Sequence, residues 1–246
     1  MTIWMRRDVK PTEKSYDDLL ARAKRGKLTA QEVSAVVGEL QRPDSSNDRY
    51  TLLHILGQSG ATAYRRLVEQ FLDCREEPML ARLALKILCD YWAGTAQYLP
   101  EILRFLRGLD WDEESDVRQI AISIVGEYLR TNPEPEFLRE LIHIFKNEEN
   151  EQTIREDAYI ALARAMGRDW NQLPSTAKHF DLTSQTDPII LPEAKERLFE
   201  EETYLKKHGV QTEGTFLKGI DLPDELENIL KDRKIAEEER PAIHTI

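Results

Sequence analysis

The chain of 246 residues lacks the features that mark secreted and membrane proteins. Its only cysteines, Cys74 and Cys89, are too few for a disulfide framework. No apolar run approaches the roughly 20 residues that a membrane-spanning helix needs. The N-terminal residues MTIWMRRDVK lack the apolar core of a secretory signal peptide. We therefore expect a cytoplasmic protein with no membrane segment and no structural disulfide.

Motifs for catalysis and metal binding are missing as well. The sequence has no phosphate-binding loop, no G-x-G-x-x-G ahead of a helix and no G-x-S-x-G nucleophile motif. Its five histidines show no H-E-x-x-H spacing and lie far apart, at positions 54, 143, 179, 208 and 244. We expect no metal ion, no cofactor and no catalytic role. Because folding can assemble a catalytic triad from scattered residues, an enzyme stays an alternative.

Charge is present in excess of one sign. Charged residues make up 32% of the chain and hydrophobic residues 41%, as in globular proteins with a core. The formal net charge is −11, and it is unevenly spread: residues 1–28 carry +4, residues 29–189 carry −10 and residues 190–246 carry −5. An acidic body repels phosphate backbones. The charge therefore disfavours nucleic acid and favours a basic protein as the partner.

A block of small and apolar residues recurs three times, as LARLALKILCDYW, DVRQIAISIVGEYL and TIREDAYIALARAM. Superposing the blocks aligns Ala84, Ala121 and Ala158 at equal steps of 37 residues. A period in this range is typical of helical solenoids, in which helix pairs bury their apolar faces by stacking. We therefore predict an all-α fold, a right-handed α-solenoid of about four helical hairpins.

The remaining helices follow from apolar spacing and capping signals. Outer helices are predicted at 61–73, 96–110 and 135–147, each ahead of a recurring block. A shorter first pair covers 30–41, opened by a capping box of Thr29 and Glu32, and a helix starting at Asn47 or Asp48. The predicted domains are an N-terminal cap (1–28), the repeat array (29–168), an irregular connection (169–192) and a helical C-terminal extension (193–246) whose last helix runs from about 223 to 238.

Residues 99–129 resemble a HEAT repeat. Pro100 stands early in the outer helix, an acidic turn follows, and Asp116 and Arg118 open the inner helix. Asp48 with Arg49, and more loosely Glu151 with Arg155, match the same pattern; the second block departs from it, with Ala81 and Arg82. The resemblance covers about residues 29–168. It implies a scaffold whose relatives are mostly binding proteins, with a few enzymes.

Two columns of the alignment are predicted to serve packing. Small residues share one column, where close approach of helices would exclude a large side chain: Gly57, Cys89, Gly126 and Ala163. Arginines share another, where a ladder of ion pairs and hydrogen bonds between repeats is the simplest interpretation: Arg49, Arg118 and Arg155. Tyr91, Tyr128 and Trp92 are predicted to lie in the core or at its rim.

The binding face is predicted on exposed positions of the inner helices, which line the concave side of such stacks. Leu85, Ile122 and Tyr159 form one column in which exposed apolar groups would mark a protein-binding patch. The alternative is that a later segment covers them. The full predicted site comprises Leu85, Asp90, Gln119, Ile122, Ser123, Glu127, Glu156, Tyr159, Ile160 and Arg164.

Two classes of function are consistent with the sequence. The first is a non-catalytic scaffold whose acidic concave face binds a basic protein; HEAT-like bacterial immunity proteins, which cover the active site of a cognate toxin, are one example. The second, implied by the same resemblance, is a HEAT-like enzyme such as an alkylpurine DNA glycosylase or a bilin lyase. A positive concave groove with exposed aromatics would favour the glycosylase, and Trp92, Trp111 and Trp170 are the candidates. A subunit of a larger assembly is a third alternative.

Overall fold

The structure is a computed structural model that describes residues 13–42, 49–174 and 179–209. Within these ranges the chain is helical and forms no β-strand, which confirms the all-α prediction. The chain divides into two compact units between Gly94 and Thr95. This division falls inside the range 29–168 that the sequence analysis assigned to one array. Each unit is described by itself below.

The first unit is built around α3. Its elements are α1 (Glu13–Ala23), α2 (Ala30–Leu40), α3 (Arg49–Gln58), the 3-10 turn η1 (Thr62–Tyr64), α4 (Arg65–Glu69), α5 (Pro78–Lys86) and the π-helical turn η2 (Ile87–Tyr91). Helix α3 packs against α1, α2, α5 and η2. The predicted outer helix 61–73 is reduced to η1 and the single turn of α4. The predicted inner helix 80–92 is α5 continued by η2.

In the first unit, a capping box starts α2 and a glycine allows close packing of α3. The backbone N–H of Thr29 donates to the Glu32 carboxylate at 2.9 Å, and the Glu32 N–H donates to Thr29 Oγ1 at 3.3 Å, closing the capping box of α2. Trp92 is buried, and its indole N–H donates to the carbonyl of Gly57 at 3.0 Å. A Cβ at Gly57 would collide with the Ile87 side chain. Close packing of α3 against η2 therefore requires glycine here, and Trp92 is a core residue.

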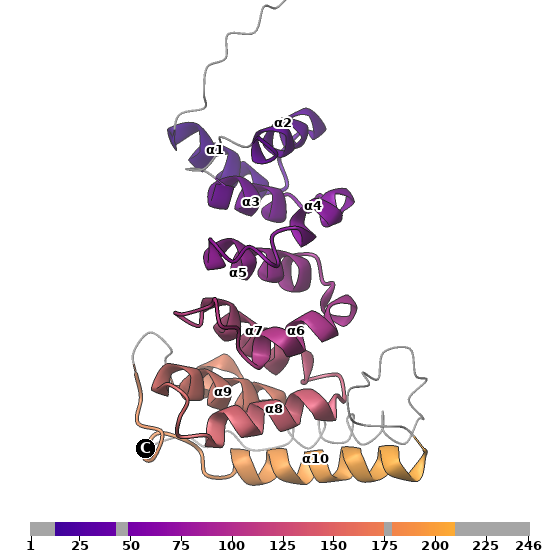
Figure 1. Ribbon diagram of the computed structural model, residues 1–246, viewed down its shortest axis with the longest axis vertical. Coiled ribbons are helices and arrows are strands. Elements are labelled where there is room, and N and C mark those ends of the chain that lie inside the picture. The colour runs from indigo at the N-terminus through magenta and orange to yellow at the C-terminus, as the bar shows by residue number, and fades with distance from the viewer. Residues whose placement is uncertain (1–12, 43–48, 175–178, 210–246) are drawn as a thin grey trace, which may run out of the picture. The chain divides into compact units, whose positions relative to one another are not determined.

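The second unit contains two helical hairpins and a long final helix. Its elements are the 3-10 turn η3 (Thr95–Gln97), α6 (Leu99–Leu106), α7 (Asp116–Tyr128), α8 (Pro135–Lys146), α9 (Gln152–Ala165), the 3-10 turn η4 (Trp170–Gln172) and α10 (Ile190–Lys207). Helix α6 packs on α7 and α8 packs on α9, while α7 lies beside α9 and α10 covers α8 and part of α9 (Figure 1). Outside η4, the described residues between α9 and α10 form turns and bends but no helix. The predicted helix 223–238 lies outside the described residues.

Capping and small residues explain the geometry of α7. The buried carboxylate of Asp112 accepts from the backbone N–H groups of Val117 and Arg118, both at 3.0 Å, which satisfies two free donors at the helix start. At the crossing with α9, a Cβ on Gly126 would lie 2.7 Å from Ala161 Cα and 2.9 Å from its Cβ. The two helices therefore pack nearly backbone to backbone at this point, which confirms the packing role predicted for the small-residue column.

Candidate protein-interaction surface

The repeating arginines fasten turns of the fold. In the second unit, Arg118 Nε donates to the carbonyl of Leu106 at 3.0 Å, and its Nη1 donates to Asn150 Oδ1 at 3.1 Å. Arg118 thus links the α6–α7 hairpin to the α8–α9 turn, and its burial lowers the pKa of its guanidinium. Arg155 Nε donates to the carbonyl of Phe145 at 3.1 Å, within its own hairpin. The predicted ladder is therefore present at Arg118, whereas Arg155 fastens only its own turn.

In the first unit, Arg49 pairs with Glu77 at 3.0 Å. This contact joins the start of α3 to the residue ahead of α5. Arg49 also lies over the ring of Phe71, with its Cζ 5.2 Å from the centroid. Like Arg118, Arg49 is a packing residue. Its predicted companion Asp48 lies outside the described residues.

The column predicted to be an exposed apolar patch is buried. Leu85 and Ile122 have no exposed surface, and Tyr159 is 4% exposed. The prediction of an exposed column was wrong because α7 packs on α6 along one side and on α9 along another, so only a narrow arc of the helix faces solvent. Accessible positions begin one residue later, about 100° further round each helix, at half-buried Lys86 and exposed Ser123.

On α9, Tyr159 lies beneath residues 179–189, which precede α10. The ring of Tyr159 lies 5.9 Å from the ring of buried Phe180, and its Oη accepts from the backbone N–H of Asp187 at 2.7 Å. Burial raises the pKa of Tyr159. Ile160 is only 5% exposed. The alternative that a later segment covers this column is therefore confirmed for α9.

Glu156 is also covered rather than presented to a partner. It is 7% exposed and accepts from Gln152 Nε2 at 2.7 Å. Its second carboxylate oxygen lies 3.1 Å from His179 Nδ1. Glu156 therefore attaches the connection between α9 and α10 to the first turns of α9 through His179, a use of His179 that sequence reasoning missed.

Two predicted site residues from different helices do meet. Arg164 Nε donates to Glu127 Oε1 at 2.6 Å, which joins the C-terminal ends of α7 and α9. Arg164 is 4% exposed, whereas the Glu127 side chain is 43% exposed. Ser123 is exposed and Gln119 is half-buried on the same arc of α7, and Asp90 is exposed in the first unit beside Lys86, at 3.8 Å. Among the predicted site residues, those still accessible are Asp90, Gln119, Ser123 and Glu127.

The opposite, N-terminal ends of α7 and α9 carry exposed carboxylates. The turns before these helices contribute six exposed acidic residues, which we name the acidic edge: Asp110, Glu113, Glu114, Glu148, Glu149 and Glu151. The Arg118–Asn150 hydrogen bond holds the two turns together. Arg118 lies close enough to Glu151 for the two charges to attract each other. Negative charge therefore accumulates on one edge of the second unit.

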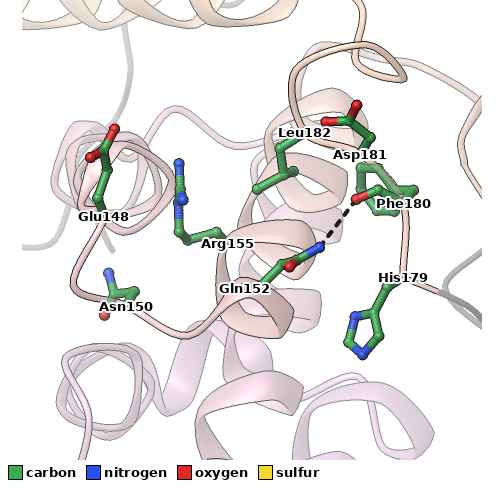
Figure 2. Close-up of a pocket in the computed structure, with 8 residues that line it drawn as sticks. All are labelled: Glu148, Asn150, Gln152, Arg155, His179, Phe180, Asp181 and Leu182. Atoms are coloured by element: carbon green, nitrogen blue, oxygen red, sulfur yellow. Dashed lines mark hydrogen bonds between the residues drawn. The ribbon is translucent and has the colours of Figure 1, made fainter.

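A groove of about 570 Å³ adjoins the acidic edge, between the α8–α9 turn, the start of α9 and residues 179–182 (Figure 2). Gln152 spans it, donating to the carbonyl of Phe180 at 3.4 Å. Arg155 lies in the middle of the lining, with Glu148 on one side and Asp181 on the other (Figure 2). Hydrogen bonds from Ser184 and Thr183 lower the pKa of Asp181 to about 2, so it is ionised at neutral pH. The groove is thus polar, with carboxylates at both sides and a guanidinium between them.

Charge is divided sharply between the two units. Residues 1–94 contain 15 Lys and Arg against 13 Asp and Glu, whereas residues 95–246 contain 19 against 32. The negative charge of the protein therefore belongs to the second unit. The net charge counted over residues 29–189 did not show this, because that range includes parts of both units.

Comparison with known proteins found no matching family model, curated protein or solved structure.

Two general searches of the described residues complete the account of the site. No group of three or more His, Cys, Asp or Glu side chains is placed to hold a metal ion within these ranges. In the same part of the chain, no helix is both long and apolar enough to cross a membrane. The arrangement that stands out is the acidic edge with its polar groove.

Proposed function

We propose that this protein is a non-catalytic scaffold that binds a basic protein through the acidic edge of its second unit. The observation that carries the proposal is the gathering of six exposed carboxylates on two turns that Arg118 and Asn150 hold together. Such a surface attracts a basic partner over a distance of about one Debye length, about 8 Å at physiological salt. It speeds association with that partner and repels nucleic acid.

The groove supplies specific contacts, which the electrostatic field of the acidic edge cannot provide by itself. Glu148 and Asp181 on its two sides accept hydrogen bonds from lysine or arginine side chains. Between them, the Arg155 guanidinium donates to backbone or side-chain oxygens of a bound segment, and the Gln152 amide oxygen accepts from its N–H groups. This alternation of charge suits a polar, basic segment of a protein better than an apolar small molecule.

We also propose that the helical hairpins form a HEAT-like solenoid, of which the second unit is the better matched part. The contacts of Arg118, the close approach at Gly126 and the capped turn before α7 support this proposal. On the same resemblance, the basic partner is a toxin domain that the protein neutralises by covering it. A toxic nuclease is a suitable ligand because such enzymes carry the positive charge needed to bind nucleic acid.

Affinity capture with the full chain tests the proposal when it is repeated with two variants of equal net charge. The edge variant carries Glu113→Gln, Glu114→Gln, Glu148→Gln and Glu149→Gln. The control variant carries Asp17→Asn, Asp73→Asn, Glu76→Gln and Glu196→Gln, all exposed positions that are not part of the acidic edge. We expect the native chain and the control variant to retain one basic protein and the edge variant to lose it. Equal retention by all three, or retention only of an acidic protein, would overturn the proposal.

A further inference from the structure

A tryptophan stands exposed at the end of the second unit opposite the acidic edge. Trp170 is the first residue of η4, just after α9, and 56% of its surface is exposed. The guanidinium carbon of Arg164 lies 4.8 Å from the centroid of its ring. A cation at this distance over an aromatic face is an attractive contact. Trp170 is therefore held in place from the protein side while much of its surface faces solvent.

Four charged side chains support this ring. Buried Arg164 contacts Glu127 at 2.6 Å and Asp169 at 3.7 Å. Arg130 contacts the same two carboxylates, Glu127 at 3.6 Å and Asp169 at 3.7 Å. Two cations and two anions thus form one closed network across the ends of α7 and α9. Because each guanidinium has carboxylate partners, the network presents no net positive charge to an approaching ligand.

Backbone geometry fixes the ring further. Asp169 and Gln172 form a capping box around η4, in which the Asp169 N–H donates to Gln172 Oε1 at 2.8 Å. The backbone on both sides of the indole is therefore constrained by hydrogen bonds. Little conformational entropy is lost when a partner binds a side chain that is already held in this way. Exposed, preorganised tryptophans are the residue type most enriched among energetic hot spots of interfaces.

The surroundings of the ring indicate what it binds. Glu127 and Asp169 are both substantially exposed, with 43% and 71% of their side-chain surfaces accessible. Asp169 is the residue next to Trp170, and Glu127 contacts the guanidinium that lies over its ring, so both carboxylates are near the indole. Arginine suits a ring with carboxylates near it better than lysine does, because its guanidinium stacks on aromatic faces and donates several hydrogen bonds in one plane.

We infer that Trp170, together with Asp169 and Glu127, forms a second contact for the basic partner and receives an arginine side chain of that partner. The inference rests on the proposed function. The two contacts lie at opposite ends of α9, which is 14 residues and therefore about 21 Å long. A single small protein domain spans this distance.

Titration of the full chain with hexaarginine and hexalysine peptides at physiological salt tests the inference. The Trp170 indole N–H is followed by NMR and assigned with the Trp170→Phe variant. We expect hexaarginine to shift this signal more than hexalysine does. We also expect Trp170→Leu to weaken hexaarginine binding about fivefold and to change hexalysine binding by less than twofold.

Controls separate the second contact from the acidic edge. Phe199→Leu removes an aromatic ring that is 71% exposed on α10, and we expect it to leave both affinities unchanged. One outcome overturns only the inference at Trp170: hexaarginine binds, the edge variant weakens this binding, and Trp170→Leu does not. The proposed function stands in that case. If neither the edge variant nor Trp170→Leu affects either peptide, both proposals are overturned. Melting curves of the Leu variants check that each is folded.

Discussion

Arg164 donates a 2.6 Å hydrogen bond to Glu127, a residue 37 positions earlier in the chain. This separation equals the step between the aligned alanines of the recurring blocks, Ala121 and Ala158. The period in the sequence therefore corresponds to a contact between successive inner helices, α7 and α9. Glu127 is also the last exposed residue of α7, and Arg164 lies over the ring of Trp170. The pair separated by this period is therefore part of the proposed binding surface.

Gly126→Ala is expected to destabilise the protein although alanine favours helices. The added Cβ would meet the backbone of Ala161 at 2.7 Å, and backbone cannot move without shifting α9. Overpacking of this kind costs about 1–3 kcal/mol, against a gain in helix propensity of about 1 kcal/mol. Gly38→Ala is the matched comparison, because it also adds a Cβ inside a helix, α2, but nothing lies within 4 Å of that Cβ. Urea denaturation should show a larger loss of stability for Gly126→Ala, and an equal loss would contradict the backbone contact.

The pair Arg164–Glu127 is expected to show strong coupling in a double-mutant cycle. Glu127→Gln leaves a guanidinium that is 4% exposed with Asp169 as its nearest carboxylate, at 3.7 Å, so the charge is poorly compensated. Arg164→Met removes the buried charge and keeps much of the volume. We expect a coupling free energy of about 1–2 kcal/mol in unfolding experiments. Additive effects of the two substitutions would show that the pair contributes nothing beyond its separate contacts.

Tyr159→Phe is expected to loosen the segment that covers α9. The substitution removes the acceptor of the 2.7 Å hydrogen bond from the Asp187 N–H but keeps the ring that packs near Phe180. A lost hydrogen bond of this type costs about 1 kcal/mol. Hydrogen exchange should become faster at Asp187 and its neighbours and stay unchanged in α7. Unchanged protection of the Asp187 amide would show that the hydroxyl does not hold this segment.

Tyr128 is expected to make stability fall at alkaline pH. Burial, with a smaller contribution from Glu134, raises the pKa of this phenol from 10.0 to about 12. Between these values the unfolded chain loses the proton and the folded protein keeps it, so the stabilisation is complete below pH 10 and is lost as pH rises toward 12. Tyr128→Phe should reduce the slope of unfolding free energy against pH in this window. Identical slopes for the two proteins would contradict the assigned pKa.

Some features of the fold were predictable because they depend on short-range signals. Thr29 and Glu32 predicted the start of α2, and the small residue at Gly126 predicted a close helix crossing. The outer helix 61–73 was overestimated, since its apolar spacing is compatible with a 3-10 turn followed by one helical turn. The spacing of apolar residues predicts which side of a helix is buried, but it does not predict how many residues the helix contains.

The candidate site was only partly predictable, for two physical reasons. A helix with neighbours on two sides exposes only a few positions, so adjacent residues can differ completely: Ile122 is buried and Ser123 is exposed. The cover over Tyr159 comes from Phe180, an aromatic residue in an otherwise polar stretch, and that isolated aromatic is the signal that could have indicated it. The meeting of Glu148 with Asp181 across a groove depends on tertiary structure and has no signal in the sequence.

The dissociation constant of the complex with the captured basic partner, measured for the edge variant and for its charge-matched control at two salt concentrations, tests the central claim most directly. Both variants change net charge equally, so a difference between them reports the position of the carboxylates. We predict at least a tenfold weakening for the edge variant, less than twofold for the control, and a shallower salt dependence for the edge variant. Equal weakening by the two variants would contradict the claim that the acidic edge is the binding surface.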